Sequence, residues 1–221
     1  MTAPDQPWAE PVLEIDEHAE RADPVVADQE IRVLARANRL AVRCDPATRH
    51  EGPTPGTQLL DFPLRCVAHA HPECRFRWVR LTLNLSETDG ACVTDLSPRD
   101  EVSEHPVKIS TTYSGGLKFD IAALPVHPEL SVERGTEQDV YFPKISVSGI
   151  DFGYAMWDFT GVGEEPLKVD RPLRLLAAVP ATASGIPVQL TLRALVTARG
   201  AVGRIPLIGR QNTTIPLKTT A

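Results

Sequence analysis

The residues from Val188 to Ala198 alternate between apolar and more polar side chains, and this alternation constrains the fold more than any other feature of the chain. The apolar positions of this stretch are Val188, Leu190, Leu192, Ala194, Val196 and Ala198. Successive side chains of a β-strand point to opposite faces of a sheet, so a period of two predicts one long strand with one buried face. The chain is therefore expected to be an antiparallel β-protein, although a burial pattern by itself specifies no chemistry.

A second alternation runs from Leu60 to Ala70, with apolar residues at the even-numbered positions. In the segment 75–85 the apolar positions change from even to odd numbers. A strand cannot change faces without an extra residue, so this change predicts a β-bulge near Trp78 and Val79. Strand-like segments recur through the rest of the chain. We therefore predict an all-β fold, an antiparallel β-sandwich of immunoglobulin-like architecture with about nine or ten strands.

Two hairpins are predicted within this sandwich. The first pairs Leu173–Val179 with Val188–Ala198, and the second pairs Val107–Tyr113 with Leu117–Ile121 across Ser114-Gly115-Gly116. The chain contains 20 prolines among 221 residues, above the usual ~5%. Proline interrupts helices and central strands alike, so this composition favours short strands separated by many turns.

Residues 30–43 fit two patterns. Ile31, Val33 and Ala35 alternate as in a strand, whereas Ile31, Leu34 and Ala35 could form the apolar stripe of a helix. We favour the strand because the rest of the chain is predicted to be β-structure.

The sequence divides into an acidic arm and one domain. Residues 1–28 contain several prolines among many carboxylates and are predicted to be poorly ordered, and residues 29–221 are predicted to form a single sandwich domain. The first 30 residues carry nine acidic residues and one basic residue, whereas residues 190–221 carry five basic residues and no acidic one. Two solvated termini are the simpler interpretation. The alternative is that the acidic arm docks on the basic C-terminal edge, within one molecule or between neighbours.

The acidic start is the opposite of a signal peptide, and no apolar run approaches the ~20 residues of a membrane helix. We therefore predict a cytoplasmic protein without membrane contact, in which the four cysteines are thiols rather than disulfides. The net charge of −6 argues against nucleic-acid binding.

The segment Cys66–Cys74 contains the residue types of a tetrahedral zinc site, because Cys66, His69, His71 and Cys74 lie within nine residues. In a strand, however, Cys66 lies on the opposite parity from the two histidines, which leaves His69, His71 and Cys74 as a smaller candidate set. The alternative is a small buried residue at Cys66, two surface histidines and a turn cysteine. No other cofactor is predicted.

Aromatic residues gather around Tyr154 and Trp157, and Trp78 lies in another long strand. One interpretation is a pocket lined by Trp78, Tyr154 and Trp157, since rigid aromatic surfaces commonly anchor ligands. The alternative is that Trp157 and Phe159 pack in the core.

Basic residues near the C-terminus, Arg199, Arg204 and Arg210, are candidates for contact with a partner, or else belong to a solvated tail. The sequence contains no Gly-x-Ser-x-Gly elbow, and its paired carboxylates lie in polar loops. We therefore predict that the protein is not an enzyme.

The function predicted from these features is a non-catalytic cytoplasmic interaction or accessory module that works within a larger assembly, with a protein partner or with itself. One alternative is a β-barrel that binds a small ligand or peptide in an aromatic pocket. The other is a zinc-binding protein that uses Cys66, His69, His71 and Cys74.

Overall fold

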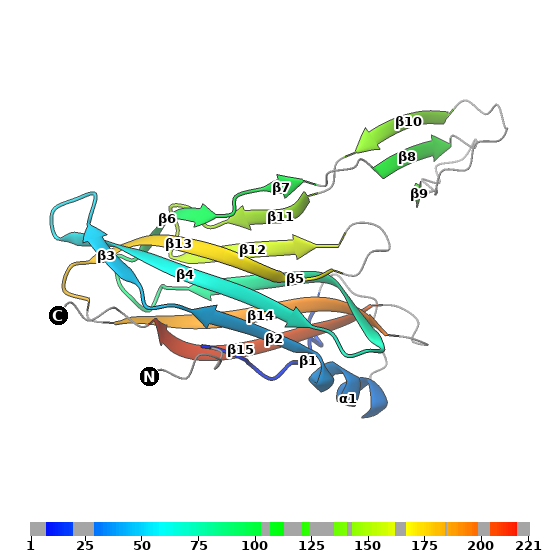
Figure 1. The fold of residues 1–221 in the computed structure, drawn as a ribbon, viewed down its shortest axis with the longest axis horizontal. Coiled ribbons are helices and arrows are strands. Elements are labelled where there is room, and N and C mark those ends of the chain that lie inside the picture. Colours follow the sequence, from blue (N-terminus) through cyan, green and yellow to red (C-terminus); the bar gives the residue numbers. More distant parts are fainter. Residues whose placement is uncertain are drawn as a thin grey trace.

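The computed structural model describes residues 8–19, 29–102, 107–112, 121–123, 135–140, 143–161, 167–183, 185–198 and 204–215. Strands account for 64% of the described residues, and two antiparallel sheets pack face to face as a sandwich (Figure 1). The predicted all-β sandwich is therefore confirmed, but its immunoglobulin-like character is not. Fifteen strands are present in the described residues, more than predicted, because several are very short and a third sheet is added.

The large sheet has seven strands in the order β1 (Glu14–Ile15), β15 (Ile205–Ile215), β14 (Ile186–Ala198), β5 (Cys74–Asn84), β12 (Tyr154–Thr160), β11 (Pro143–Ser148) and β7 (Glu101–Val102). The small sheet has the order β2 (Arg39–Cys44), β4 (Thr57–His69), β13 (Asp170–Pro180) and β6 (Cys92–Ser97), and β3 (Thr48–Glu51) pairs with β4. A third sheet, called the inserted sheet below, has the order β10 (Gly135–Val140), β8 (Val107–Thr112) and β9 (Ile121–Ala123). The one helix of the described residues is α1 (Gln29–Ala37).

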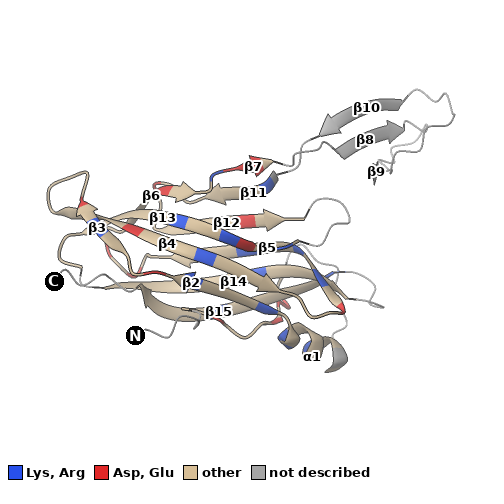
Figure 2. Ribbon diagram, in the orientation of Figure 1, with Lys and Arg blue, Asp and Glu red and all other residues tan. Residues whose placement is uncertain are grey.

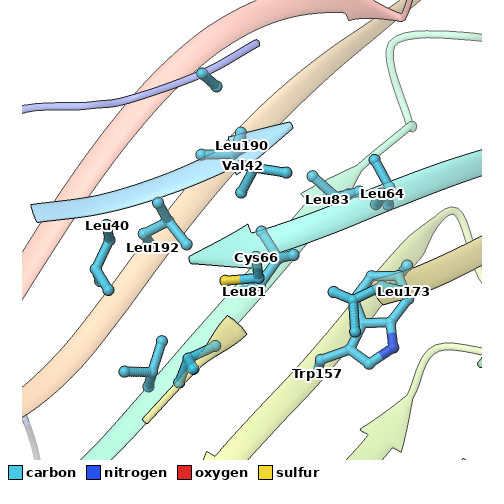
Figure 3. Packing of buried hydrophobic residues seen from close by; sticks show 14 of the residues in the cluster. Leu40, Val42, Leu64, Cys66, Leu81, Leu83, Trp157, Leu173, Leu190 and Leu192 are labelled. Carbon is cyan, nitrogen blue, oxygen red and sulfur yellow. The ribbon is translucent and has the colours of Figure 1, made fainter. Parts of the chain in front are cut away.

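The core lies between the large sheet and the small sheet, where the alternating apolar residues of both meet (Figure 3). Every even-numbered residue of β14 from Val188 to Ala198 is buried, as the alternation predicted. In β4 the even positions from Leu60 to Cys66 are buried in the same way. Complete burial of each valine, leucine or phenylalanine side chain among them stabilises the fold by about 1.5–3 kcal/mol, so the alternation is the main sequence determinant of the sandwich.

The predicted bulge is present in β5. Leu195 of β14 is opposite Trp78 and the next residue, Val196, is opposite Phe76, so Arg77 is the extra residue. Because of this extra residue, Phe76 and Val79 are both buried, although they have opposite parity. Trp78 is left half-buried.

Residues 30–43 form a helix followed by a strand, so the prediction of one strand is wrong. Ala35 is buried, and Ile31 and Leu34 pack against the core, which is the helical stripe that the sequence also allowed. Asn38 follows the helix: its side-chain amide donates to the carbonyl of Leu34, and its side-chain oxygen accepts from the N–H of His71. Burial of the stripe therefore outweighs the alternation at this position.

The first predicted hairpin is also wrong, because β13 lies in the small sheet and β14 in the large one. The connection after Pro180 crosses between the layers, where Gln58 donates to the carbonyls of Pro180 and Ala183. The second predicted hairpin is found only in part: β8 pairs with β9, but β9 begins at Ile121, where the predicted strand ended. Residues 113–120, which include the predicted turn at 114–116, lie outside the described residues.

The inserted sheet lies apart from the sandwich, beyond the ends of β7 and β11 (Figure 1). These two strands are neighbours at the edge of the large sheet, and the chain leaves from β7 and returns to β11. In the described part of the chain, no helix has the length and apolar character needed to cross a membrane.

Candidate functional site: the N-terminal strap and the outer face of the large sheet

Residues 8–19, called the strap below, join the edges of the two main sheets. Ala9 pairs with Val42 of β2 through two backbone hydrogen bonds, of 3.0 and 2.8 Å. Farther along the strap, Ile15 is opposite Leu207 of β15, and the N–H of Asp16 donates to the carbonyl of Pro206. The prediction of a poorly ordered arm is therefore wrong for this segment, which docks on the sandwich.

The strap also contributes to the core. Ala9 and Leu13 each expose only 1% of their surface. Gly209 of β15 makes this close approach possible, because a Cβ placed there would lie 3.0 Å from Pro11 Cγ and 3.1 Å from Leu13 Cδ2. These distances are shorter than ordinary carbon–carbon contacts of ~3.5–4.0 Å, so even a single Cβ at position 209 would require Pro11 and Leu13 to shift, and a larger side chain would require a larger shift.

Acidic residues of the strap face arginines of the body. Glu17 lies 3.2 Å from Arg32 and Glu14 lies 3.6 Å from Arg36, and both arginines are on α1, where Figure 2 marks basic residues in blue. Glu10 pairs with Arg39, and this hydrogen bond raises the pKa of the arginine. Each of these surface ion pairs is weak by itself. Together they favour an acidic segment at the place where the strap lies beside α1 and β2.

A cleft of about 300 Å³ lies between the end of the strap and the outer face of the large sheet. Its charged and aromatic lining is contributed by Asp16, His18, Trp78, Arg80 and Arg193. A second hollow, of about 360 Å³, lies beside it and is lined by both acidic and basic residues.

A row of charged residues crosses the sheet at this cleft, with Arg193, Arg80 and Asp158 in register on β14, β5 and β12. Arg80 donates two hydrogen bonds of 2.7 Å to Asp158, and its guanidinium lies 5.0 Å from the centre of the Trp78 ring. Arg193 lies 3.6 Å from Asp16, which is longer than a hydrogen bond. Two neighbouring arginines would repel each other, and the two carboxylates offset that repulsion.

The three predicted pocket aromatics are not brought together. Trp157 is fully buried in the core, as the alternative proposed, while Trp78 lines the cleft. Tyr154 lies at the other end of β12, opposite Asn84, with its ring 5.6 Å from that of Phe152. The predicted aromatic pocket is therefore wrong, because the bulge and the length of β12 separate its members.

The predicted zinc ligands do not converge either. Cys66 and Cys74 are buried, whereas His69 is exposed and His71 accepts a hydrogen bond from the N–H of Glu73 through Nδ1. Among the described residues, no group of three or more potential ligands could hold a metal ion. All four cysteines are free thiols, as predicted.

The predicted basic residues have different positions. Arg204 and Arg210 are exposed, and Arg210 lines the second hollow beside Glu14 and Glu17. Arg199 lies outside the described residues. An acidic arm on a basic edge was the alternative predicted from the charge distribution, whereas the arginines of α1 and β2 and the role of Gly209 were not predicted.

The chain is similar to some solved structures but matches no protein family and no curated protein. Among solved structures, the chain is similar to the delta-toxin of Clostridium perfringens, with 9% identity, a TM-score of 0.42 and coverage of 80% of this chain and 83% of that chain. It is also similar to the Clostridium perfringens NetB toxin in its membrane-inserted form, with 9% identity, a TM-score of 0.33 and coverage of 80% and 86%. A third structure, described as a pore forming protein, shows 9% identity, a TM-score of 0.31 and coverage of 80% and 88%.

The predictions of a cytoplasmic accessory module, of a cytoplasmic location and of no membrane contact are not upheld, because these three solved structures are described as toxins and as a pore forming protein. At 9% identity, the similarity itself concerns the fold alone. The predictions rested on the lack of an apolar run of helical length. That criterion does not bear on membrane contact made by short alternating strands, whose signal in a sequence is much weaker.

Proposed function

We propose that this protein binds lipid membranes through the inserted sheet and that it does so without catalysing a reaction. The observation that carries the proposal is the distribution of charged residues between the two faces of that sheet. Partners across an antiparallel ladder share a face, so the register of the three strands assigns each residue to one face.

The register divides the positions of the inserted sheet into two sets, one for each face, and the sequence has no charged residue in one of these sets. On this face, Ile109 of β8 is opposite Gln138 of β10 and Ala123 of β9. The described positions of this face are Val107, Ile109, Thr111, Ile121, Ala123, Thr136, Gln138 and Val140. The positions of the other face are Lys108, Ser110, Thr112, Ala122, Gly135, Glu137 and Asp139. In the sequence, the charged residues of the three strands, Lys108, Glu137 and Asp139, all occupy register positions of the second set. This is the pattern expected of a sheet whose first set of positions contacts lipid.

The position of the inserted sheet supports this role. Because it lies apart from the sandwich, it can contact a bilayer while the core between the two main sheets stays intact (Figure 1). Its strands β8 and β10 have six residues each, so they are about 20 Å long. The hydrocarbon core of a bilayer is ~30 Å thick, so strands of this length enter one leaflet rather than crossing both.

A role without catalysis is supported by the state of two thiols. Burial raises the pKa of Cys66 to about 12, and burial together with the charge of Asp45 raises the pKa of Cys44 to about 12. The thiolate is the nucleophilic form of cysteine, so both residues stay protonated and unreactive near neutral pH.

The test is co-flotation of the full-length protein with phosphatidylcholine vesicles, with and without phosphatidylserine. Ile109→Lys places a charge on the uncharged face, whereas Ser110→Lys adds the same charge to the other face. A lysine in contact with hydrocarbon costs about 2 kcal/mol or more. We therefore expect Ile109→Lys to weaken binding about thirtyfold. The control should change binding to phosphatidylcholine only slightly.

Equal effects of the two substitutions, or a wild-type protein that stays with the unbound fraction on both kinds of vesicle, would contradict the proposal. Neither substitution should change the thermal unfolding of the sandwich, because the inserted sheet lies apart from its core.

A further inference from the structure

We propose that the strap is exchanged between copies of this protein, so that the strap of one copy binds between β2 and β15 of a second copy. The proposal rests on the strap and its binding position and does not depend on membrane binding. It identifies an interaction surface whose partner is the same segment of another chain.

The edge of β15 is the first reason. β15 has eleven residues, and β1 pairs with only two of them, Ile208 and Leu207. Elsewhere along this edge the strap makes isolated contacts: Trp8 Nε1 donates to the carbonyl of Thr214, and the N–H of Glu10 donates to the side chain of Gln211. The outer edge of β15, opposite the edge that is fully paired with β14, is therefore a template on which a segment of another chain can be added.

Charge complementarity identifies the occupant. The strap contributes Glu10, Glu14, Asp16 and Glu17, and the body contributes Arg39, Arg36, Arg193 and Arg32 in matching order. Leu13, a buried residue of the strap, fits beside Gly209, where the lack of a side chain leaves room for it. The strap of a second copy carries the same residues and would make the same contacts.

The length of the segment that joins the strap to α1, called the tether below, determines how often exchange occurs. Residues 20–28 join the strap to α1, and nine residues span at most ~30 Å. Exchange keeps every contact and changes only which chain supplies the strap, which is the low-cost route of domain swapping. A short tether gives the strap of the same chain a high effective concentration, so exchange should increase with protein concentration.

The experiment uses the register of β1 with β15, in which Glu14 is directly opposite Ile208. Directly opposite residues of an antiparallel pair have Cβ atoms ~4.5–5.5 Å apart, close enough for a disulfide after a small adjustment. Glu14→Cys and Ile208→Cys are placed in separate full-length copies with tags of different size, both in a Cys44→Ser, Cys92→Ser background. The two copies are mixed, oxidised and separated without reductant.

We expect a mixed disulfide between the two copies, with a yield that increases with protein concentration. The matched control replaces Glu14→Cys by Glu51→Cys, an exposed acid on β3 away from the strap. A double variant with both cysteines in one chain should form the disulfide within that chain, which shows that the geometry is suitable.

A mixed-disulfide yield no higher than that of the Glu51→Cys control at every concentration, while the double variant forms its internal disulfide, would overturn exchange. Failure of the double variant to form a disulfide, within a chain or between chains, would overturn the position of the strap and the proposal with it.

Discussion

Gly209→Val should release the strap, and this prediction can be tested through the coupling between two substitutions. At position 209 a Cβ alone would lie 3.0 Å from Pro11 and 3.1 Å from Leu13, and valine adds two methyl groups beyond it. The strap is the movable partner, because β15 is paired with β14 along its whole length. Gly209→Val should therefore expose Leu13, which is 1% exposed in the wild-type protein.

The magnitude follows from that burial. Complete burial of a leucine side chain contributes about 1.5–3 kcal/mol. Leu13→Ala in the wild-type protein should therefore lower the free energy of unfolding by about 2 kcal/mol, and should lower the Tm of a chain of this size by about 4–8 °C. In the Gly209→Val background, Leu13 is already exposed, so the same substitution should cost almost nothing.

Unfolding by heat and by urea is monitored by circular dichroism for four proteins: the wild type, Leu13→Ala, Gly209→Val and the double variant. Gly153→Ala provides the control background, because a Cβ at Gly153 would lie 3.6 Å or more from its neighbours and leave the strap in place. In that background, Leu13→Ala should retain its full cost. The reasoning would be refuted by a Leu13→Ala effect of equal size in the wild-type and Gly209→Val proteins, since coupled sites must depart from additivity.

Three further predictions concern the body of the sandwich and the inserted sheet. Asp158→Asn should lower the free energy of unfolding by about 1–2 kcal/mol in urea, because Arg80 loses a charged acceptor in a partly shielded position; an unchanged midpoint would contradict this. The free energy of unfolding should fall as the pH rises from about 9 to about 12, because the thiol of Cys66 loses its proton in the unfolded chain but keeps it in the folded one. Cys66→Ala should make this decline shallower, and an identical decline would contradict the assignment. Gln138→Leu should strengthen vesicle binding in the flotation assay, because it removes the most polar group from the uncharged face of the inserted sheet, and weaker binding would contradict that face assignment.

The main strands could be predicted from the sequence because burial on one face imposes a period of two. The period of two correctly predicted the strands β4 and β14 and the bulge at Arg77. A period of two does not show which sheet a strand joins, so the change of layer between β13 and β14 was missed. The helix α1 was missed because its stripe and a strand alternation share Ile31 and Ala35.

The candidate site was less accessible from the sequence. Trp78 was predicted to line a pocket and does line the cleft, but its neighbours there, Arg80 and Arg193, are set by cross-strand register, which no local pattern encodes. The acidic strap was visible as a charge bias, whereas its arginine partners on α1 and β2 depend on how residues 8–19 cross the side of the sandwich. Gly209 gives no signal in the sequence because its importance comes from a distant contact.

The central claim, that one face of the inserted sheet contacts lipid, is tested most directly by single-cysteine labelling along β8. Each position from Val107 to Thr112 is replaced in turn by cysteine in the Cys44→Ser, Cys92→Ser background and labelled with an environment-sensitive fluorophore. Vesicles containing a lipid-borne quencher are then added. The proposal predicts quenching at the odd-numbered positions 107, 109 and 111 and little change at the even-numbered ones, following the register of the sheet. Quenching that is uniform along the strand, or absent from it, would contradict the claim.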